Sequence, residues 1–152
     1  VVNMEAVMPG NLVEVEGKFG TLGTGGPRQI DVFSGTVTDK GPAPMQPMPL
    51  TADPATYIGA PSGMPTPQAF IDANGVLVKF DNVRINSRDN TYQDFVVNTT
   101  MTSGATIATN YLRAKGNYMS PTVGTTLQSV TGIVFSNFRG TVWARTTADV
   151  KP

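Results

Sequence analysis

The feature that most constrains the fold of this chain is a long alternation of apolar and polar residues at positions 75–86, GVLVKFDNVRIN. Apolar residues recur at every second position of its first half, as in a strand with one buried face: Val76, Val78 and Phe80. The alternation resumes at Val83 and Ile85 after Asp81-Asn82, which predicts a β-bulge between the two halves. A long, bulged strand is what a small antiparallel barrel needs to serve both of its sheets. The stretch therefore predicts the shared strand of such a barrel.

Composition favours strands and turns over helices along the whole chain. The 152 residues include 16 Gly and 12 Pro, which favour turns and disfavour long helices. The length suits one domain with one hydrophobic core. The sequence therefore predicts an all-β fold as a single domain over residues 1–152. A small antiparallel barrel would be joined by one short helix and an additional N-terminal β-hairpin.

The additional hairpin is predicted at residues 1–41. Alternation indicates a strand at 11–19, and a glycine-rich connection leads to a returning strand at 29–38 with a kink at Ser34-Gly35. Residues 42–67 hold most of the prolines, which no sheet interior could accommodate, so they are predicted to form an ordered crossover and not a linker. Three residues of this crossover would anchor it to the barrel: Leu50, Tyr57 and Ile58.

One short helix is predicted at residues 66–74, TPQAFIDAN. Thr66 is its predicted N-cap, Pro67 takes the first helical position, and Gly75 follows as the C′ residue. The apolar residues of this helix would close one end of the barrel: Ala69, Phe70, Ile71 and Ala73. The remaining strands are predicted at 94–98, 107–113, 126–134 and 139–145, after which residues 146–152 leave the barrel.

Charge and side-chain chemistry exclude several function classes. Lys and Arg number 11, and Asp and Glu also number 11, so no net charge attracts the chain to nucleic acid or to an anionic membrane. The chain lacks Cys and His, which excludes disulfides, thiolate zinc sites and a histidine general base. No apolar run approaches the roughly 20 residues needed to cross a bilayer. We therefore expect no enzyme activity, no catalytic residue, no cofactor, no metal site and no membrane span.

Two polar motifs allow more than one interpretation. Asp89, Asn90 and Asp94 carry oxygen atoms that attract calcium. A hairpin turn uses the same residue types for local hydrogen bonds, and their spacing matches no complete calcium loop, so calcium binding stays open. Residues 98–100, Asn-Thr-Thr, have the form of a glycosylation sequon, which many chains contain by chance.

The first and last hairpins share a pattern of glycine spacing and alternation. Residues 9–19 and 28–37, PGNLVEVEGKF and RQIDVFSGTV, parallel residues 123–134 and 138–150, VGTTLQSVTGIV and FRGTVWARTTADV. If the last hairpin completes the barrel, the first is the end of a second barrel whose beginning this sequence does not contain. Either the first hairpin folds onto the crossover, or a neighbouring molecule supplies the missing strands.

Residues 75–86, the DFVV that follows at 94–97, and the last hairpin at 123–150 together carry a family resemblance. They resemble the OB-fold-type domains of secreted bacterial proteins, including those appended to extracellular nucleases and lamin-tail-like surface proteins. The resemblance implies an OB-like barrel in a non-catalytic module that is secreted or lies on the bacterial cell surface. It transfers no catalytic residue, because in such nucleases the chemistry belongs to a separate domain.

Two functions follow from these observations. The first is a structural or interaction module that assembles with copies of itself, or with another surface protein. Its unpaired first hairpin and the apolar arm at residues 1–8 would act by strand addition. The alternative is binding of single-stranded nucleic acid or oligosaccharide on the barrel face. The candidate ligand-binding residues of this alternative are Tyr92, Tyr111, Phe138, Arg84, Arg88, Arg113 and Arg139. Three further aromatic residues are expected in the core: Phe80, Phe95 and Trp143.

Overall fold

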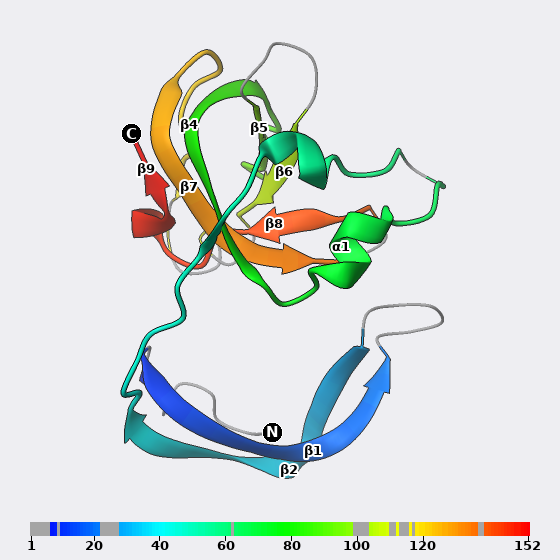
Figure 1. Cartoon of the computed structure of the whole chain (residues 1–152), viewed down its shortest axis with the longest axis vertical. Coiled ribbons are helices and arrows are strands. Elements are labelled where there is room, and N and C mark those ends of the chain that lie inside the picture. Colours follow the sequence, from blue (N-terminus) through cyan, green and yellow to red (C-terminus); the bar gives the residue numbers. More distant parts are fainter. Residues whose placement is uncertain are drawn as a thin grey trace. The chain divides into compact units, whose positions relative to one another are not determined.

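The computed structural model arranges the chain in two compact units. It describes residues 7–8, 10–21, 28–61, 63–98, 104–109, 112, 116, 118–136 and 139–152, without the side chains of 21 and 28–34. The units are Val1–Met48 and Pro49–Pro152. Figure 1 shows a two-stranded hairpin in the first unit and a barrel in the second. The single domain expected over residues 1–152 stays a prediction, and each unit is described by itself.

The first unit is built on one long antiparallel hairpin, as the sequence predicts. Its strands are β1 (Asn11–Thr21) and β2 (Arg28–Pro42). Their register shifts just after Glu16, where β2 carries the extra residues. The kink expected at Ser34-Gly35 lies in this shift. A side chain on Gly35 would collide with the carbonyl oxygen of Glu16, so only glycine lets the two strands approach here.

The second unit is a closed five-stranded barrel, which confirms the predicted fold class. Its elements in chain order are β3 (Leu50–Thr51), η2 (Pro54–Tyr57), α1 (Gln68–Asp72), β4 (Leu77–Arg88), β5 (Phe95–Asn98), β6 (Ala105–Ala108), β7 (Thr126–Phe135), β8 (Thr141–Trp143), η3 (Thr147–Asp149) and β9 (Val150–Lys151). The strands follow one another around the barrel as β4, β5, β6, β8 and β7, and pairing of β4 with β7 closes the ring. β6 and β8 are parallel, whereas the other barrel pairs are antiparallel. A closed five-stranded barrel with crossed strand order is the OB-like arrangement that the sequence predicts.

The long strand β4 organises the barrel because it pairs with two neighbours. Its first part is antiparallel to β7 and its last part is antiparallel to β5. The four inward side chains expected from its alternation are fully buried: Val78, Phe80, Val83 and Ile85. Val76 was expected on the same buried face, but it lies before the strand and is exposed. The predicted shared strand is therefore confirmed from Val78 onward.

The sequence predicts a β-bulge at Asp81-Asn82, but the structure has a different irregularity there. Residues on both sides of Asn82 pair with β7 in one unbroken register, so neither strand carries an extra residue there. Asn82 instead adopts a left-handed backbone with φ of 51°, and the inward phase of the strand changes at this residue. The register shift of β4 lies further along, between Ile85 and Ser87, where it pairs with β5.

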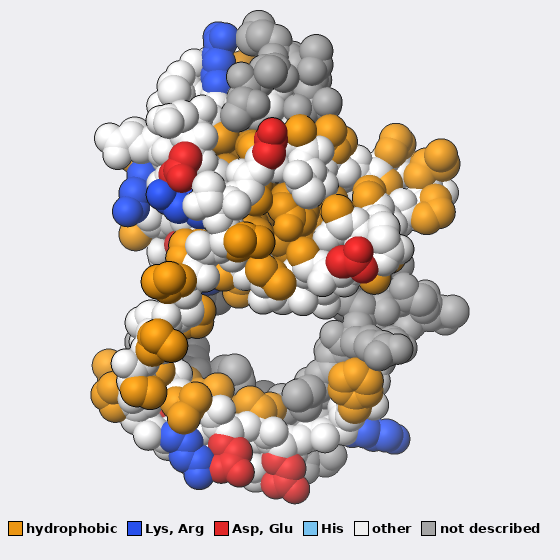
Figure 2. Space-filling model, in the orientation of Figure 1, with side chains coloured by type: hydrophobic (Ala, Val, Ile, Leu, Met, Phe, Trp, Pro, Cys, Tyr) orange, Lys and Arg blue, Asp and Glu red, His pale blue; other side chains and the backbone are white. Residues whose placement is uncertain are grey.

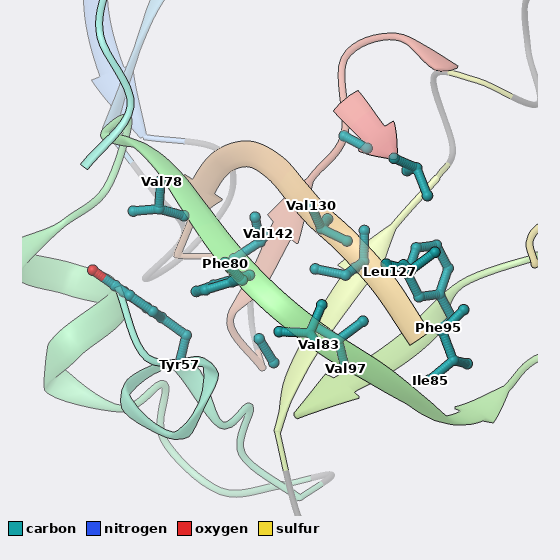
Figure 3. Packing of buried hydrophobic residues seen from close by; sticks show 14 of the residues in the cluster. Tyr57, Val78, Phe80, Val83, Ile85, Phe95, Val97, Leu127, Val130 and Val142 are labelled. Carbon is teal, nitrogen blue, oxygen red and sulfur yellow. The ribbon is translucent and has the colours of Figure 1, made fainter. Parts of the chain in front are cut away.

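Buried side chains from all five barrel strands form one core (Figure 3). Two short helices add aromatic rings to it. The ring centroids of Tyr57 in η2 and Phe70 in α1 are 5.5 Å apart, and those of Tyr57 and Phe80 are 6.0 Å apart. The predicted anchoring by Tyr57 and closure by Phe70 are thus confirmed. Three other residues expected to anchor the crossover or close the barrel are exposed: Leu50, Ile58 and Ile71.

The short helix is present, but its caps differ from those predicted. Its N-cap is Pro67 and not Thr66, so α1 begins one residue later than expected. Its C-cap is Ala73, and Gly75 therefore lies two residues beyond the cap and not at C′. Gly75 still has the left-handed backbone expected of a helix-ending glycine, with φ of 86°.

Two of the late strands, β6 and β8, are shorter than their predicted ranges. β6 starts before the expected range 107–113 and ends at Ala108, and β8 covers only the middle of the expected range 139–145. Residues 146–152 do not leave the barrel, because η3 leads into β9, which pairs with β7. Local alternation shows that a segment is extended, but the partner strand decides where pairing stops.

Candidate interaction surfaces

Three of the candidate ligand-binding residues lie on β4 or in the β4–β5 turn. Arg84 and Arg88 lie at outward positions of β4, and Tyr92 is exposed in the turn. Both guanidinium groups hold the connection that precedes β7. Arg84 Nε donates to the carbonyl oxygen of Gly124 at 3.3 Å, and Arg88 Nη1 donates to that of Ser120 at 3.2 Å. These arginines therefore stabilise a loop against the barrel, whatever else they bind.

Of the polar residues considered for calcium, Asp89 and Asn90 make local hydrogen bonds of the turn, whereas Asp94 binds Thr109 just after β6. Asp89 accepts two backbone N–H groups of the turn through Oδ1, at 2.7 and 2.9 Å. Asn90 Oδ1 accepts a hydrogen bond from Arg88 Nε at 3.0 Å, and Asp94 Oδ1 accepts one from the backbone N–H of Thr109 at 2.8 Å. The described residues hold no group of three or more acidic side chains that could bind a metal ion. The turn interpretation thus accounts for Asp89 and Asn90.

A buried glutamine ties the β4–β5 turn to the connection before β7. Gln93 Oε1 accepts hydrogen bonds from both the backbone N–H and the hydroxyl of Ser120, each at 3.1 Å. Gln93 Nε2 donates to the carbonyl oxygen of Asn90 at 2.8 Å. Gln93 has a φ of 61°, which is uncommon for a residue other than glycine. The sequence gives no signal for this role, because Ser120 is distant along the chain.

Arg139 lies at the other end of the β4–β7 ladder from this turn. Its backbone carbonyl oxygen accepts a hydrogen bond from the N–H of Ala60 at 2.7 Å. Because β7 is antiparallel to β4, the end of β7 that leads to Arg139 lies beside the start of β4 (Figure 1). The remaining candidates lie outside the described residues: Tyr111, Arg113 and Phe138. The structure thus brings Arg84, Arg88 and Tyr92 to one end and separates Arg139 from them.

The aromatic residues expected in the core fall into two groups. Phe80 and Phe95 are fully buried in the barrel, as predicted. Trp143 is only partly buried, because Val142 beside it in β8 takes the inward position. The Trp143 ring packs on Phe135 with centroids 4.8 Å apart, and its Nε1 donates to the hydroxyl of a threonine in the same strand at 2.9 Å. The prediction that Trp143 lies in the core is therefore wrong.

Two buried polar groups have no hydrogen-bond partner among the described residues. One is the side-chain amide of Asn98, which is 2% exposed. This asparagine is the acceptor position of the sequon at 98–100, and its burial blocks glycosylation of the folded chain. The other is the hydroxyl of Tyr118, and burial raises the pKa of Tyr118 to about 12.

Replacing Tyr118 by Phe should therefore stabilise the barrel by about 1 kcal/mol at pH 7, because it removes a buried hydroxyl that no described residue hydrogen-bonds. The pKa of Tyr118 is raised above its usual 10.0 in the folded state, so the unfolded chain loses the phenol proton first. The free energy of unfolding is therefore unaffected by this group below pH 10 and falls as the pH rises from 10 through 12. Urea unfolding from pH 8 to 12 should show that loss in the wild type and a flatter profile in the variant. Tyr92→Phe is the exposed control. A Tyr118→Phe variant less stable than the wild type would contradict the unsatisfied hydroxyl.

The β1–β2 hairpin has one mainly apolar face and one mainly polar face, although Asp39 lies opposite Val13 on the first and Leu12 shares the second. Val15 lies opposite Val37 across the ladder, and Val13 shares their face. Val13 and Val15 are 37% and 39% exposed, and Phe19 further along β1 is 66% exposed. The polar face of the paired region carries Glu14, Glu16, Thr36, Thr38 and Lys40. Glu14 and Lys40 form an ion pair at 2.5 Å, and Figure 2 shows acidic and basic side chains close together on this hairpin.

The part of the hairpin that the structure describes contains two strands, joined along one ladder.

In the described part of the chain, no helix combines the length and the apolar character needed to cross a bilayer. Comparison with protein-family models, with curated proteins and with solved structures found no match to this chain.

Proposed function

We propose that this chain is a non-catalytic extracellular structural module that assembles with copies of itself through its N-terminal hairpin. The observation that carries the proposal is the amphipathic β1–β2 sheet, whose apolar face is open to solvent. The extracellular setting comes from the resemblance to domains of secreted bacterial proteins. Such a module needs no reactive group, and hydrogen bonds lower the pKa of both Asp39 and Asp149.

The energetics of a two-stranded sheet support assembly. An isolated hairpin is at best marginally stable in water, and three or more strands with an apolar face are needed for independent stability. Fully burying a Val or Phe side chain contributes roughly 1.5–3 kcal/mol. Much of this stabilisation would be gained only if a second copy buried three side chains that are each at least 37% exposed: Val13, Val15 and Phe19. Added strands from a second copy would supply both the missing ladder and a larger apolar face.

The test is the mass of the particle in solution as a function of protein concentration. Wild-type protein should sediment above the mass of one chain, 16.1 kDa, at micromolar to millimolar concentration. Val15→Lys should weaken self-association about 10- to 100-fold, because it puts a charge on the apolar face. Thr38→Lys is the matched control, since it adds the same charge to the polar face, opposite Glu14. A strict monomer at millimolar concentration, or equal losses in both variants, would overturn the proposal.

One observation favours a second candidate function, binding of single-stranded nucleic acid or oligosaccharide. The exposed Tyr92 lies in the turn between the first two barrel strands, and Arg88 ends the strand that leads into this turn. OB-type barrels bind such ligands with the loop in this position. Fluorescence titration with oligothymidine at several salt concentrations tests it, with Tyr92→Ala expected to weaken binding by about 1–3 kcal/mol. Salt-independent binding, or none, would leave assembly as the single proposed function.

A further inference from the structure

We propose that a second copy of this chain adds to the open edge of β1 in antiparallel register, with the two-fold axis at Gly17. The inference rests on the proposed assembly and specifies its interface. β1 pairs with β2 along one edge, and no described strand pairs with its other edge. Two hairpins joined there form one sheet in the order β2, β1, partner β1, partner β2. That sheet has the strand number that a lone hairpin lacks.

The charges of β1 select this register. Its charged residues are Glu14, Glu16 and Lys18, which alternate along one face of the strand. An axis at Val15 would place Glu14 opposite Glu16 twice. Axes at Glu16 or at Lys18 would place that residue opposite itself. Only an axis at Gly17 places Glu16 opposite Lys18 of the second copy twice, with no like charges opposed.

The apolar residues agree with the same register. With the axis at Gly17, Val15 lies opposite Phe19 of the second copy, and both lie on the side away from Glu16. A slip by one residue would instead oppose Val15 to Lys18, joining the apolar face of one copy to the polar face of the other. Gly17 at the axis adds no side chain between the two strands. Because a two-fold interface uses the same edge of β1 in both copies, it joins two copies of β1 and no more.

Single cysteines test this register, because the natural chain contains no Cys. Two variants are made separately, Glu16→Cys and Lys18→Cys, and each is oxidised alone and as an equal mixture. Residues directly opposite in antiparallel strands are close enough for a disulfide. The mixture should give at least about tenfold more disulfide-linked dimer than either variant alone. Thr38→Cys mixed with Lys18→Cys is the control, since β2 lies a further strand, about 4.8 Å, from the axis.

Charge exchange gives a second, independent measurement. Glu16→Lys alone should weaken the dimer about tenfold, and Glu16→Lys with Lys18→Glu should restore it, because the pair is re-formed with reversed sign. Lys18 also lies opposite Asp31 within the hairpin, so the cysteine mixture, which adds no charge, is the primary test.

The outcomes separate this inference from the proposed function. Cross-linking of Glu16→Cys with itself would put the axis at residue 16, and cross-linking of Lys18→Cys with itself would put it at residue 18. An assembled particle with no cross-link at either position would place the interface elsewhere. Each of these three results overturns the register while self-assembly stands. A wild-type chain that stays monomeric overturns both.

Discussion

Replacing Gly140 by Ala should destabilise the barrel by about 3–5 kcal/mol, because two costs add at this residue. Gly140 has a φ of 76°, where a side chain strains the backbone. Its Cβ would also lie within 2.6 Å of three ring atoms of Phe70, which is fully buried. The ring cannot move aside without leaving the core. Equilibrium unfolding in guanidinium chloride measures the loss.

Gly75→Ala is the matched control for Gly140→Ala. Gly75 has a similar backbone with φ of 86°, but no atom lies within 4 Å of a Cβ built on it. It should therefore lose only the conformational cost, about 1–2 kcal/mol. Adding Phe70→Leu to Gly140→Ala should recover part of the larger loss, since the smaller side chain makes room for the methyl group. Equal losses at Gly140 and Gly75 would show that packing against Phe70 contributes nothing.

Replacing Asp149 by Asn should cost about 2–4 kcal/mol of unfolding free energy at pH 7. The buried carboxylate of Asp149 accepts Arg145 Nη2 and Nε at 2.8 and 3.1 Å, forming a two-pronged ion pair. It also accepts the backbone N–H groups of Arg145 and Thr146 at 2.8 and 3.0 Å. An amide offers one acceptor oxygen in place of two, so some of these donors lose their partner. The contacts hold η3, which leads β9 onto the barrel.

The same carboxylate predicts a loss of stability in acid. Burial alone would raise the pKa of Asp149, but hydrogen bonds from Arg145 and Thr146 outweigh it and lower the pKa from 3.8. The contribution of Asp149 is therefore complete above about pH 4 and is lost as the pH falls through the folded-state pKa. The difference between wild type and Asp149→Asn should shrink below pH 3.8. Unfolding curves from pH 2 to 7 measure this.

Asp53→Asn is the control for Asp149→Asn. Asp53 is exposed and accepts the N–H of Ala55 at 2.9 Å as the N-cap of η2. Asparagine caps a helix about as well as aspartate, so the change should cost less than about 0.5 kcal/mol. If Asp149→Asn were equally mild, or if its effect were the same at pH 2 and pH 7, the buried ion pair would not stabilise the C-terminal segment.

Much of the fold could be predicted because its signals are local. The inward positions of β4 follow from a period of two residues, and four of them are buried as expected. Glycine and proline marked the hairpin and the short helix. They did not show that Leu50–Thr51, within the predicted crossover, pair with β4. The ends of β6 and β8 could not be predicted, because each stops where its partner strand stops. The change of phase in β4 was visible in the sequence, but its cause was not, since a bulge and a left-handed Asn82 shift the alternation in the same way.

The candidate barrel site was only partly predictable for a related reason. Residue type indicated Arg88 and Tyr92, which lie at the β4–β5 turn, and Arg84, which lies further back on β4 opposite the last residue of β5. Residue type also indicated Arg139, which the antiparallel β4–β7 ladder carries to the other end of the barrel. The hairpin surface was easier, because its apolar and polar faces alternate within one strand and require no distant residue.

The sequence by itself determined the all-β class, the strand that two sheets share and the two faces of β1, because side-chain direction in a strand depends only on neighbouring residues. Only the tertiary structure decided that Gln93 holds Ser120, that Arg84 holds Gly124 and that Gly140 leaves room for Phe70. These contacts join residues that are far apart in the chain. They exist only once the barrel has closed, and burial in its core or against its surface then fixes which partner each group finds.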